Sequence, residues 1–156
     1  MIDIIPLTAC QNTIPELAKL WYVLLGQKWA PHVSLEQVAE RFQKHCNDDQ
    51  LPITLVAFKD GKAVGMCSLR EQDGIREDLK PWLGSLVVDS KFQGQGIAVE
   101  LIEAIKEKAK QMNYKELFLF TFDETLPNYY SKLGWETMGI DTFQSKPVTV
   151  MRVDIY

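Results

Sequence analysis

The chain has 156 residues, of which 46% are hydrophobic and 24% are charged, which is the composition of an ordinary globular protein of one domain's length. Its formal net charge of −4 at pH 7 argues against nucleic acid as a partner, because proteins that bind nucleic acid usually carry a basic patch.

The N-terminal third of the sequence predicts one strand followed by two helices. Residues 2–7 form a short apolar run typical of a strand. Asn12 and Thr13 offer N-cap oxygens to a helix that carries Pro15 in its first turn. Ser34 opens a Ser-Leu-Glu-Gln sequence, which resembles a capping box, so we expect the second helix to begin there.

The middle of the sequence predicts a hairpin and a central strand. Residues 53–58 and 63–69 are apolar runs that flank an Asp-Gly pair at 60–61, a pair typical of tight hairpin turns. A polar stretch over 70–80 then leads to a third apolar run at 83–88.

The last third predicts two helices and three strands. They are a long amphipathic helix over 97–112, an aromatic-rich strand over 117–122, a short helix over 126–133 that ends at Gly134, and a final hairpin of 135–143 and 148–155 around Lys146-Pro147. Hairpins combined with a single βαβ unit favour an α/β protein with a mixed sheet and helices on both faces. Because no linker or repeat interrupts the order, we expect a single domain over residues 1–156.

The cysteines and the N-terminus indicate a compartment. Cys10, Cys46 and Cys67 are odd in number and widely spaced, which favours free thiols over disulfides or a zinc site. Free thiols fit a reducing environment. The sequence shows no secretory leader and no apolar run near the ~20 residues of a membrane span. We therefore expect a cytoplasmic protein with no metal, no membrane and no nucleic-acid partner.

The segment that predicts chemistry is residues 87–98, where a strand enters a glycine-bearing turn and then a helix. Gly94 and Gly96 lack Cβ atoms, and a helix N-terminus offers unpaired N–H groups with about half a positive charge. We interpret the amides of 93–98 as a pyrophosphate site, the alternative being a tight turn and nothing more. The loop lacks the Gly-Lys-Ser/Thr of a Walker A motif, and Val99 breaks a dinucleotide-binding fingerprint.

Two motifs resemble those of the GNAT acetyltransferases. Gln93-x-x-Gly96-x-Ala98 is similar to the family's Arg/Gln-x-x-Gly-x-Gly/Ala signature. The segment from Asn128 to Trp135, Asn-Tyr-Tyr-Ser-Lys-Leu-Gly-Trp, resembles the family's Phe/Leu-Tyr-x-Lys-Leu-Gly-Phe segment. The resemblance implies the GNAT fold, in which a mixed, mostly antiparallel sheet of six to seven strands has helices on both faces.

The resemblance also implies a function. It is that of an acetyl-CoA-dependent N-acetyltransferase acting on a primary amine, of a small molecule or of a peptide or protein N-terminus, by direct attack in a ternary complex. Acetyl-CoA is then the co-substrate, no metal is required, and the protein is a monomer or homodimer. The alternative is a GNAT-fold module that binds acyl-CoA with little acceptor chemistry. The residues implied to bind coenzyme A are Leu86, Val87, Val88, Gln93, Gly94, Gln95, Gly96, Ile97 and Ala98.

Tyr130 stands at the position of the family's general acid, which protonates the departing thiolate. A thiol pKa is about 8.5 and a tyrosine pKa about 10, so the transfer is not strongly uphill. The competing interpretation is that Tyr130 only packs against the sheet. We expect its neighbour Tyr129 to point away and join the core. A backbone N–H near Val88 is implied to face the thioester carbonyl, a contact worth about 3 kcal/mol in the transition state.

The general base is less defined by the sequence. Many relatives use a Glu near the start of the strand before the loop, where this chain has no carboxylate. Glu71 is the first candidate base, and Asp73 and His32 are the alternatives. For each of the three, a solvated surface position is the competing interpretation.

The sequence departs from the family pattern at two positions and offers several aromatic residues for an acceptor cleft. Asp123 replaces a usual Asn, and with Glu124 it would attract a cation. Gln93 is the less common first loop residue and removes one cation, for which Lys91 would compensate. Aromatic residues that are candidates to wall the acceptor cleft are Trp21, Tyr22, Trp29, Trp82 and Phe143.

Overall fold

The computed structural model describes residues 1–155, with every side chain among them except that of Trp29. Seven strands form one sheet in the order β1-β2-β3-β4-β5-β7-β6, in which only the β4–β5 pair is parallel. This confirms the predicted mixed, mostly antiparallel sheet. The strands are β1 (Ile2–Pro6), β2 (Ile53–Lys59), β3 (Lys62–Arg70), β4 (Trp82–Val88), β5 (Glu116–Thr121), β6 (Glu136–Phe143) and β7 (Lys146–Asp154).

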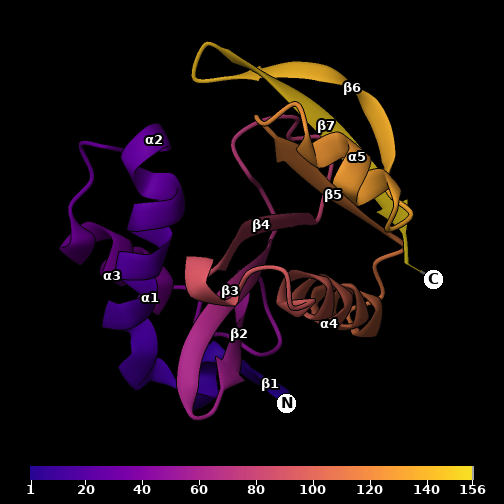
Figure 1. The fold of residues 1–156 in the computed structure, drawn as a ribbon. Coiled ribbons are helices and arrows are strands. Elements are labelled where there is room, and N and C mark those ends of the chain that lie inside the picture. The colour runs from indigo at the N-terminus through magenta and orange to yellow at the C-terminus, as the bar shows by residue number, and fades with distance from the viewer. Residues whose placement is uncertain (156) are drawn as a thin grey trace.

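Helices cover both faces of the sheet, as predicted (Figure 1). Their bounds are α1 (Ile14–Trp21), which continues through the π turn η3 (Tyr22–Gly26) into α2 (Gln27–Trp29), then α3 (Leu35–Gln43), α4 (Ile97–Gln111) and α5 (Leu126–Ser131). Figure 1 shows α1, α2 and α3 together on one side and α4 on the other, with β6 and β7 arching over α5. Within residues 1–155, no helix has the length and apolar character needed to cross a membrane.

Local signals explain several boundaries. The capping box at the start of α3 is confirmed, because the Gln37 amide donates to Ser34 Oγ and the Ser34 amide donates to Gln37 Oε1. Thr13 is the N-cap residue of α1, as expected, but its hydroxyl does not cap the helix and donates instead to the Cys10 carbonyl at 2.6 Å. The last hairpin turns at Gln144 and Ser145, both with positive φ. The predicted turn at Lys146-Pro147 is therefore two residues too late, because these two residues begin β7.

Two apolar layers hold the helices to the sheet. One lies under α4 and α5 and includes Leu101, Ile105 and Tyr130. The other lies under α1 and α3 and includes Leu17 and Phe42. A helix in this setting gains most of its stability from burying one apolar face, so α4 stays helical because its inward residues meet the sheet.

A buried polar network crosses the layer under α3. His45 Nδ1 lies 2.9 Å from Thr54 Oγ1, which lies 2.7 Å from Ser68 Oγ. Burial, together with the nearby charges of Arg70 and Arg41, lowers the pKa of His45 to about 4. The folded protein therefore holds this histidine neutral at neutral pH.

This network predicts a loss of stability in mild acid. The unfolded histidine has a pKa near 6.5, so below that pH the unfolded state binds a proton that the folded state resists. Between pH 7.5 and pH 5 the free energy of unfolding should fall by about 2 kcal/mol from His45 alone. Urea unfolding of wild type and His45→Gln at both pH values isolates this contribution. An equal pH dependence in the two proteins would contradict it.

Candidate active site

The parallel strands β4 and β5 diverge after a single point of contact. Trp82 pairs with Phe118, and the Phe118 amide donates to the Pro81 carbonyl at 3.1 Å. Figure 1 shows the two strands running apart from there. The β3–β4 register also shifts in this region, where Ser85 adopts a positive φ of 51°. A bulge of this kind re-aims the backbone, so β4 presents polar groups to the gap that β5 leaves.

The alternation of the strand shows which backbone groups face that gap. The Asp89 amide donates to the Val64 carbonyl of β3 at 2.8 Å. Successive residues of a strand direct their N–H groups to opposite sides. The Val88 amide therefore points toward the side from which β5 has diverged.

The loop after β4 has the geometry of an anion site. Gly94 and Gly96 have φ values of 80° and 81°, which favour glycine. A Cβ added at either residue would meet nothing within 4 Å, so both face open space. Gly96 is the N-cap of α4 and provides no side chain to bind the first amides of the helix. Those amides are left for a ligand, and with the helix dipole they favour an anion.

A cleft of about 550 Å³ joins the loop to β4 and α5. Seven of the nine residues implied to bind coenzyme A line it, which are Leu86, Val88, Gln93, Gly94, Gly96, Ile97 and Ala98, together with Phe92, Val99, Leu126, Tyr129 and Tyr130. Val87 does not, because its side chain is buried in the layer under α1 and α3. Gln95 does not line the cleft either, and its side chain accepts a hydrogen bond from Lys59, which lies outside the loop.

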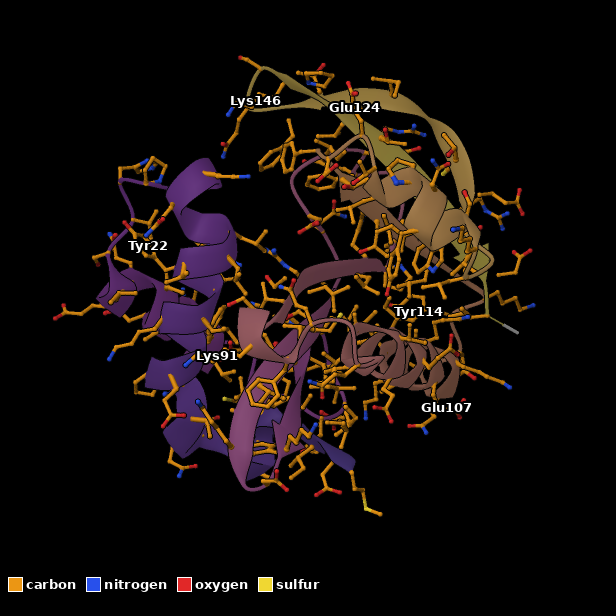
Figure 2. All side chains as sticks on the ribbon, in the orientation of Figure 1. Tyr22, Lys91, Glu107, Tyr114, Glu124 and Lys146 are labelled. Atoms are coloured by element: carbon orange, nitrogen blue, oxygen red, sulfur yellow. The ribbon has the colours of Figure 1, made fainter. Side chains whose placement is uncertain are left out.

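Lys59 lies at the end of β2. Its Nζ donates to Gln95 Oε1 at 2.6 Å and lies 5.8 Å from the centroid of the Phe92 ring. Figure 2 places Lys91, the cation expected from the sequence, on the side of its turn that faces α1. Gln93 folds back, and its Nε2 donates to the Val88 carbonyl at 3.0 Å. Lys59 thus supplies the positive charge beside the loop.

Two tyrosines of α5 line the cleft, but their exposures differ. Tyr130 is 7% exposed and belongs to the core layer under α5, whereas Tyr129 is 37% exposed. The expectation that Tyr129 would join the core is therefore wrong. Burial raises the pKa of Tyr130, and the nearby Cys67 thiol and Tyr129 raise this pKa further. The Tyr130 hydroxyl accordingly keeps its proton at neutral pH.

The three candidate bases lie in different settings. Glu71 is in solvent, with a side chain that is 61% exposed and a 3.7 Å ion pair with Lys80. His32 is exposed after α2. Asp73 is the buried one, with a side chain that is 13% exposed and 2.8 Å from Arg70 Nη1. Burial raises the pKa of Asp73 to about 7, against the opposing charge of Arg70.

The aromatic residues expected to wall the acceptor cleft differ in burial and position. Trp82 is fully buried, and Trp21 packs edge-on against Phe42 in the core. Phe143 is half-buried beside Gly74 and packs against the cluster that contains Trp82. Tyr22 is half-buried in η3 and lies far from Glu124 in Figure 2. The side chain of Trp29 lies outside the described residues.

Asp123 and Glu124 follow β5, and both are exposed. Asp123 Oδ1 accepts hydrogen bonds from the amide and hydroxyl of Thr125 at 2.8 and 2.7 Å. These bonds lower the pKa of Asp123, and the charge of Lys28 on α2 lowers it further. The carboxylate that replaces the family's Asn therefore caps its own turn.

Known proteins resemble this chain in family and in fold. Residues 17–135 match the model of the Acetyltransferase (GNAT) family. No curated protein sequence matches the chain significantly. Similar solved structures include an aminoglycoside 6'-N-acetyltransferase complexed with coenzyme A, with a TM-score of 0.72 and 18% identity over 93% of this chain and 92% of that one.

Two further solved structures are similar over nearly their whole length. A GNAT-family acetyltransferase from Streptococcus pneumoniae has a TM-score of 0.72 and 20% identity over 100% of both chains. A chimeric spermidine N-acetyltransferase from Vibrio cholerae has a TM-score of 0.76 and 18% identity over 98% of this chain and 95% of that one. At these identities the likeness shows a shared fold.

Proposed function

The chain belongs to the acetyltransferase (GNAT) family, and on that premise we propose that it transfers the acetyl group of acetyl-CoA to a primary amine. One observation carries the proposal. A single cleft has the glycine-bearing loop at one end and the buried, protonated hydroxyl of Tyr130 at the other, and it runs along β4 where β5 diverges from it. Donor binding, charge stabilisation and proton donation would thereby take place in one cleft.

The donor would lie along β4 with its phosphates on the loop. The open space at Gly94 and Gly96 allows the amides of α4 to approach a pyrophosphate closely. Backbone groups of β4 that face away from β3 would bind the pantetheine chain as a neighbouring strand would. The Val88 amide would donate to the thioester carbonyl oxygen, where negative charge develops during attack.

Tyr130 would protonate the sulfur as the C–S bond breaks. Burial raises the pKa of this tyrosine, which by itself makes it a weaker acid. A thiolate formed in the same buried setting is more basic for the same reason. The two groups therefore stay matched, and the transfer does not become strongly uphill.

The first test is release of free thiol from acetyl-CoA with a panel of primary amines, beside thermal unfolding with coenzyme A. A ligand at about 100 times its Kd stabilises by roughly 2.7 kcal/mol, which raises the midpoint by about 5–10 °C. A rise together with thiol release supports the proposal. A rise without release with any amine would indicate a binding module, and the absence of both would contradict the donor site.

A prediction concerns Lys59, whose Nζ lies beside the loop. Lys59→Ala should weaken coenzyme A binding by roughly 3- to 10-fold, since charge-assisted contacts near the surface are worth about 1 kcal/mol. Lys62→Ala is the matched control, because it removes the same charge from the cross-strand partner of Lys59 and leaves the contact of Lys59 with Gln95 in place. Calorimetric titration compares the two. Equal losses would mean that only the overall charge of the hairpin matters.

A further inference from the structure

The carboxylate of Asp73 lies directly against the backbone of β4. A Cβ added to Gly84 would lie 3.3 Å from Asp73 Oδ1 and 3.5 Å from Oδ2, so no side chain separates them. Arg70 Nη1 is 2.8 Å from Oδ1, and its Cδ would lie 3.3 Å from the same Cβ. Arg70 therefore fixes the carboxylate over Gly84, two residues beyond the point where β4 pairs with β5.

Asp73 and Tyr130 lie on opposite faces of that strand. Leu83 and Val88 pack into the layer under α4 and α5 that contains Tyr130, whereas Trp82 packs into a separate cluster. By the alternation of a strand, Gly84 faces the same side as Trp82. The Cys67 thiol, buried in the same layer as Tyr130, is 3.8 Å from the carbonyl of Gly84.

We infer that Asp73 binds the ammonium group of the acceptor and takes its proton, and that the amine reaches β4 from the face opposite the donor cleft. This inference rests on the proposed acetyl transfer. Asp73 thereby replaces Glu71, whose side chain is in solvent, as the proposed base. The two proton transfers would then take place on opposite faces of β4.

Charge and burial suit Asp73 to this role. An ammonium ion is drawn to a carboxylate in a half-buried site more strongly than to one in solvent. A base works best when its pKa is near the operating pH, and burial raises that of Asp73 to about 7. The charges around it are Arg70 from β3, the Glu71–Lys80 and Arg76–Asp78 pairs of its own loop, and Asp141 of β6 acting on Arg76.

Aromatic rings beside Asp73 indicate the class of amine. A Cβ at Gly74 would lie 2.7 Å from the edge of the Phe143 ring, so that ring packs on the residue next to Asp73. Phe143 is 5.2 Å from Phe120 and 5.8 Å from Phe122, centroid to centroid, and all three are half-buried. Aromatic faces attract cations and apolar stems. The acceptor is therefore a cationic alkyl or arylalkyl amine, not an acidic amino acid.

The protons balance as follows. The ammonium nitrogen loses one proton to Asp73, which releases it to solvent, and the neutral nitrogen then forms its bond to the acetyl carbon. As the carbon–sulfur bond breaks, Tyr130 gives its proton to the sulfur. The second proton lost by the nitrogen returns to Tyr130 through solvent. The products are the N-acetyl amine, coenzyme A as the free thiol, and one proton in solution.

Asp73→Asn tests the inference with phenylethylamine and an aliphatic diamine as acceptors and glutamate as the disfavoured one. The variant should lower kcat/KM by about 10²–10³ at pH 7 and remove the acidic limb of the pH profile, which has an apparent pKa near 7 in wild type. Its midpoint shift with coenzyme A should match wild type. Glu71→Gln, in the same loop, should behave as wild type in every respect.

Gly84→Ala is the second variant, since it keeps the carboxylate but crowds it. It should raise the KM for the amine more than it lowers kcat. A wild-type pH profile in Asp73→Asn would overturn the inference while thiol release by wild type still supported acetyl transfer. Thiol release by wild type with glutamate but neither cationic amine would overturn the acceptor class. No thiol release by wild type with any amine would remove the proposed function and the inference together.

Discussion

Replacement of Tyr130 by phenylalanine should lower turnover by about 10²–10⁴ while leaving the affinity for coenzyme A nearly unchanged. The ring of Tyr130 lies in the core layer under α5 and packs edge-on against Trp135 at 5.9 Å, and phenylalanine preserves those contacts. Among the described residues the Tyr130 hydroxyl makes no hydrogen bond, so its removal breaks no structural contact. What is lost is the proton donor at the buried end of the cleft.

Steady-state kinetics and calorimetric titration with coenzyme A separate turnover from binding. Tyr129→Phe is the matched control, because Tyr129 lines the same cleft on the same helix but is far more exposed. It should retain most of the activity. If Tyr130→Phe turned over at the wild-type rate, or if Tyr129→Phe were the slower variant, Tyr130 would not be the acid.

The sequence predicts those parts of the molecule that depend on neighbours along the chain. The capping box at Ser34, the Asp-Gly turn before β3 and the glycine-bearing loop before α4 all carry their own geometry in a few residues. Because the anion site is made of backbone amides at a helix terminus, its position follows from the helix start. The resemblance to the family motif then predicts which ligand that loop binds, the pyrophosphate of coenzyme A.

The parts that the sequence misses depend on contacts between distant segments. Lys59 reaches the loop from a hairpin 36 residues away from Gln95, so no local pattern connects them. Glu71 and Asp73 are alike in sequence, and only the packing of their loop on Gly84 buries one and exposes the other. Tyr129 and Tyr130 differ for the same reason, since the rotation of a short helix about its axis is fixed by what it packs on.

The largest effect on donor binding is expected at Gly96, the N-cap of α4. Gly96→Val should abolish the thermal stabilisation by coenzyme A, which corresponds to a loss of affinity greater than about 100-fold. The backbone at φ 81° is unfavourable for a β-branched residue, and the added side chain would occupy the open space through which the amides of α4 reach a phosphate. Thermal unfolding with and without the ligand measures both effects at once.

The two effects are separated by Gly61→Val in the β2–β3 turn. Gly61 has a φ of 78° and likewise meets nothing within 4 Å of an added Cβ, but it lies outside the donor cleft. Both variants should lose about 1–3 kcal/mol of stability from backbone strain, which lowers both ligand-free midpoints alike. Only Gly96→Val should lose the rise with coenzyme A. If both variants kept that rise, the loop would not hold the donor's phosphates, and if both lost it, the effect would arise from strain transmitted through the sheet.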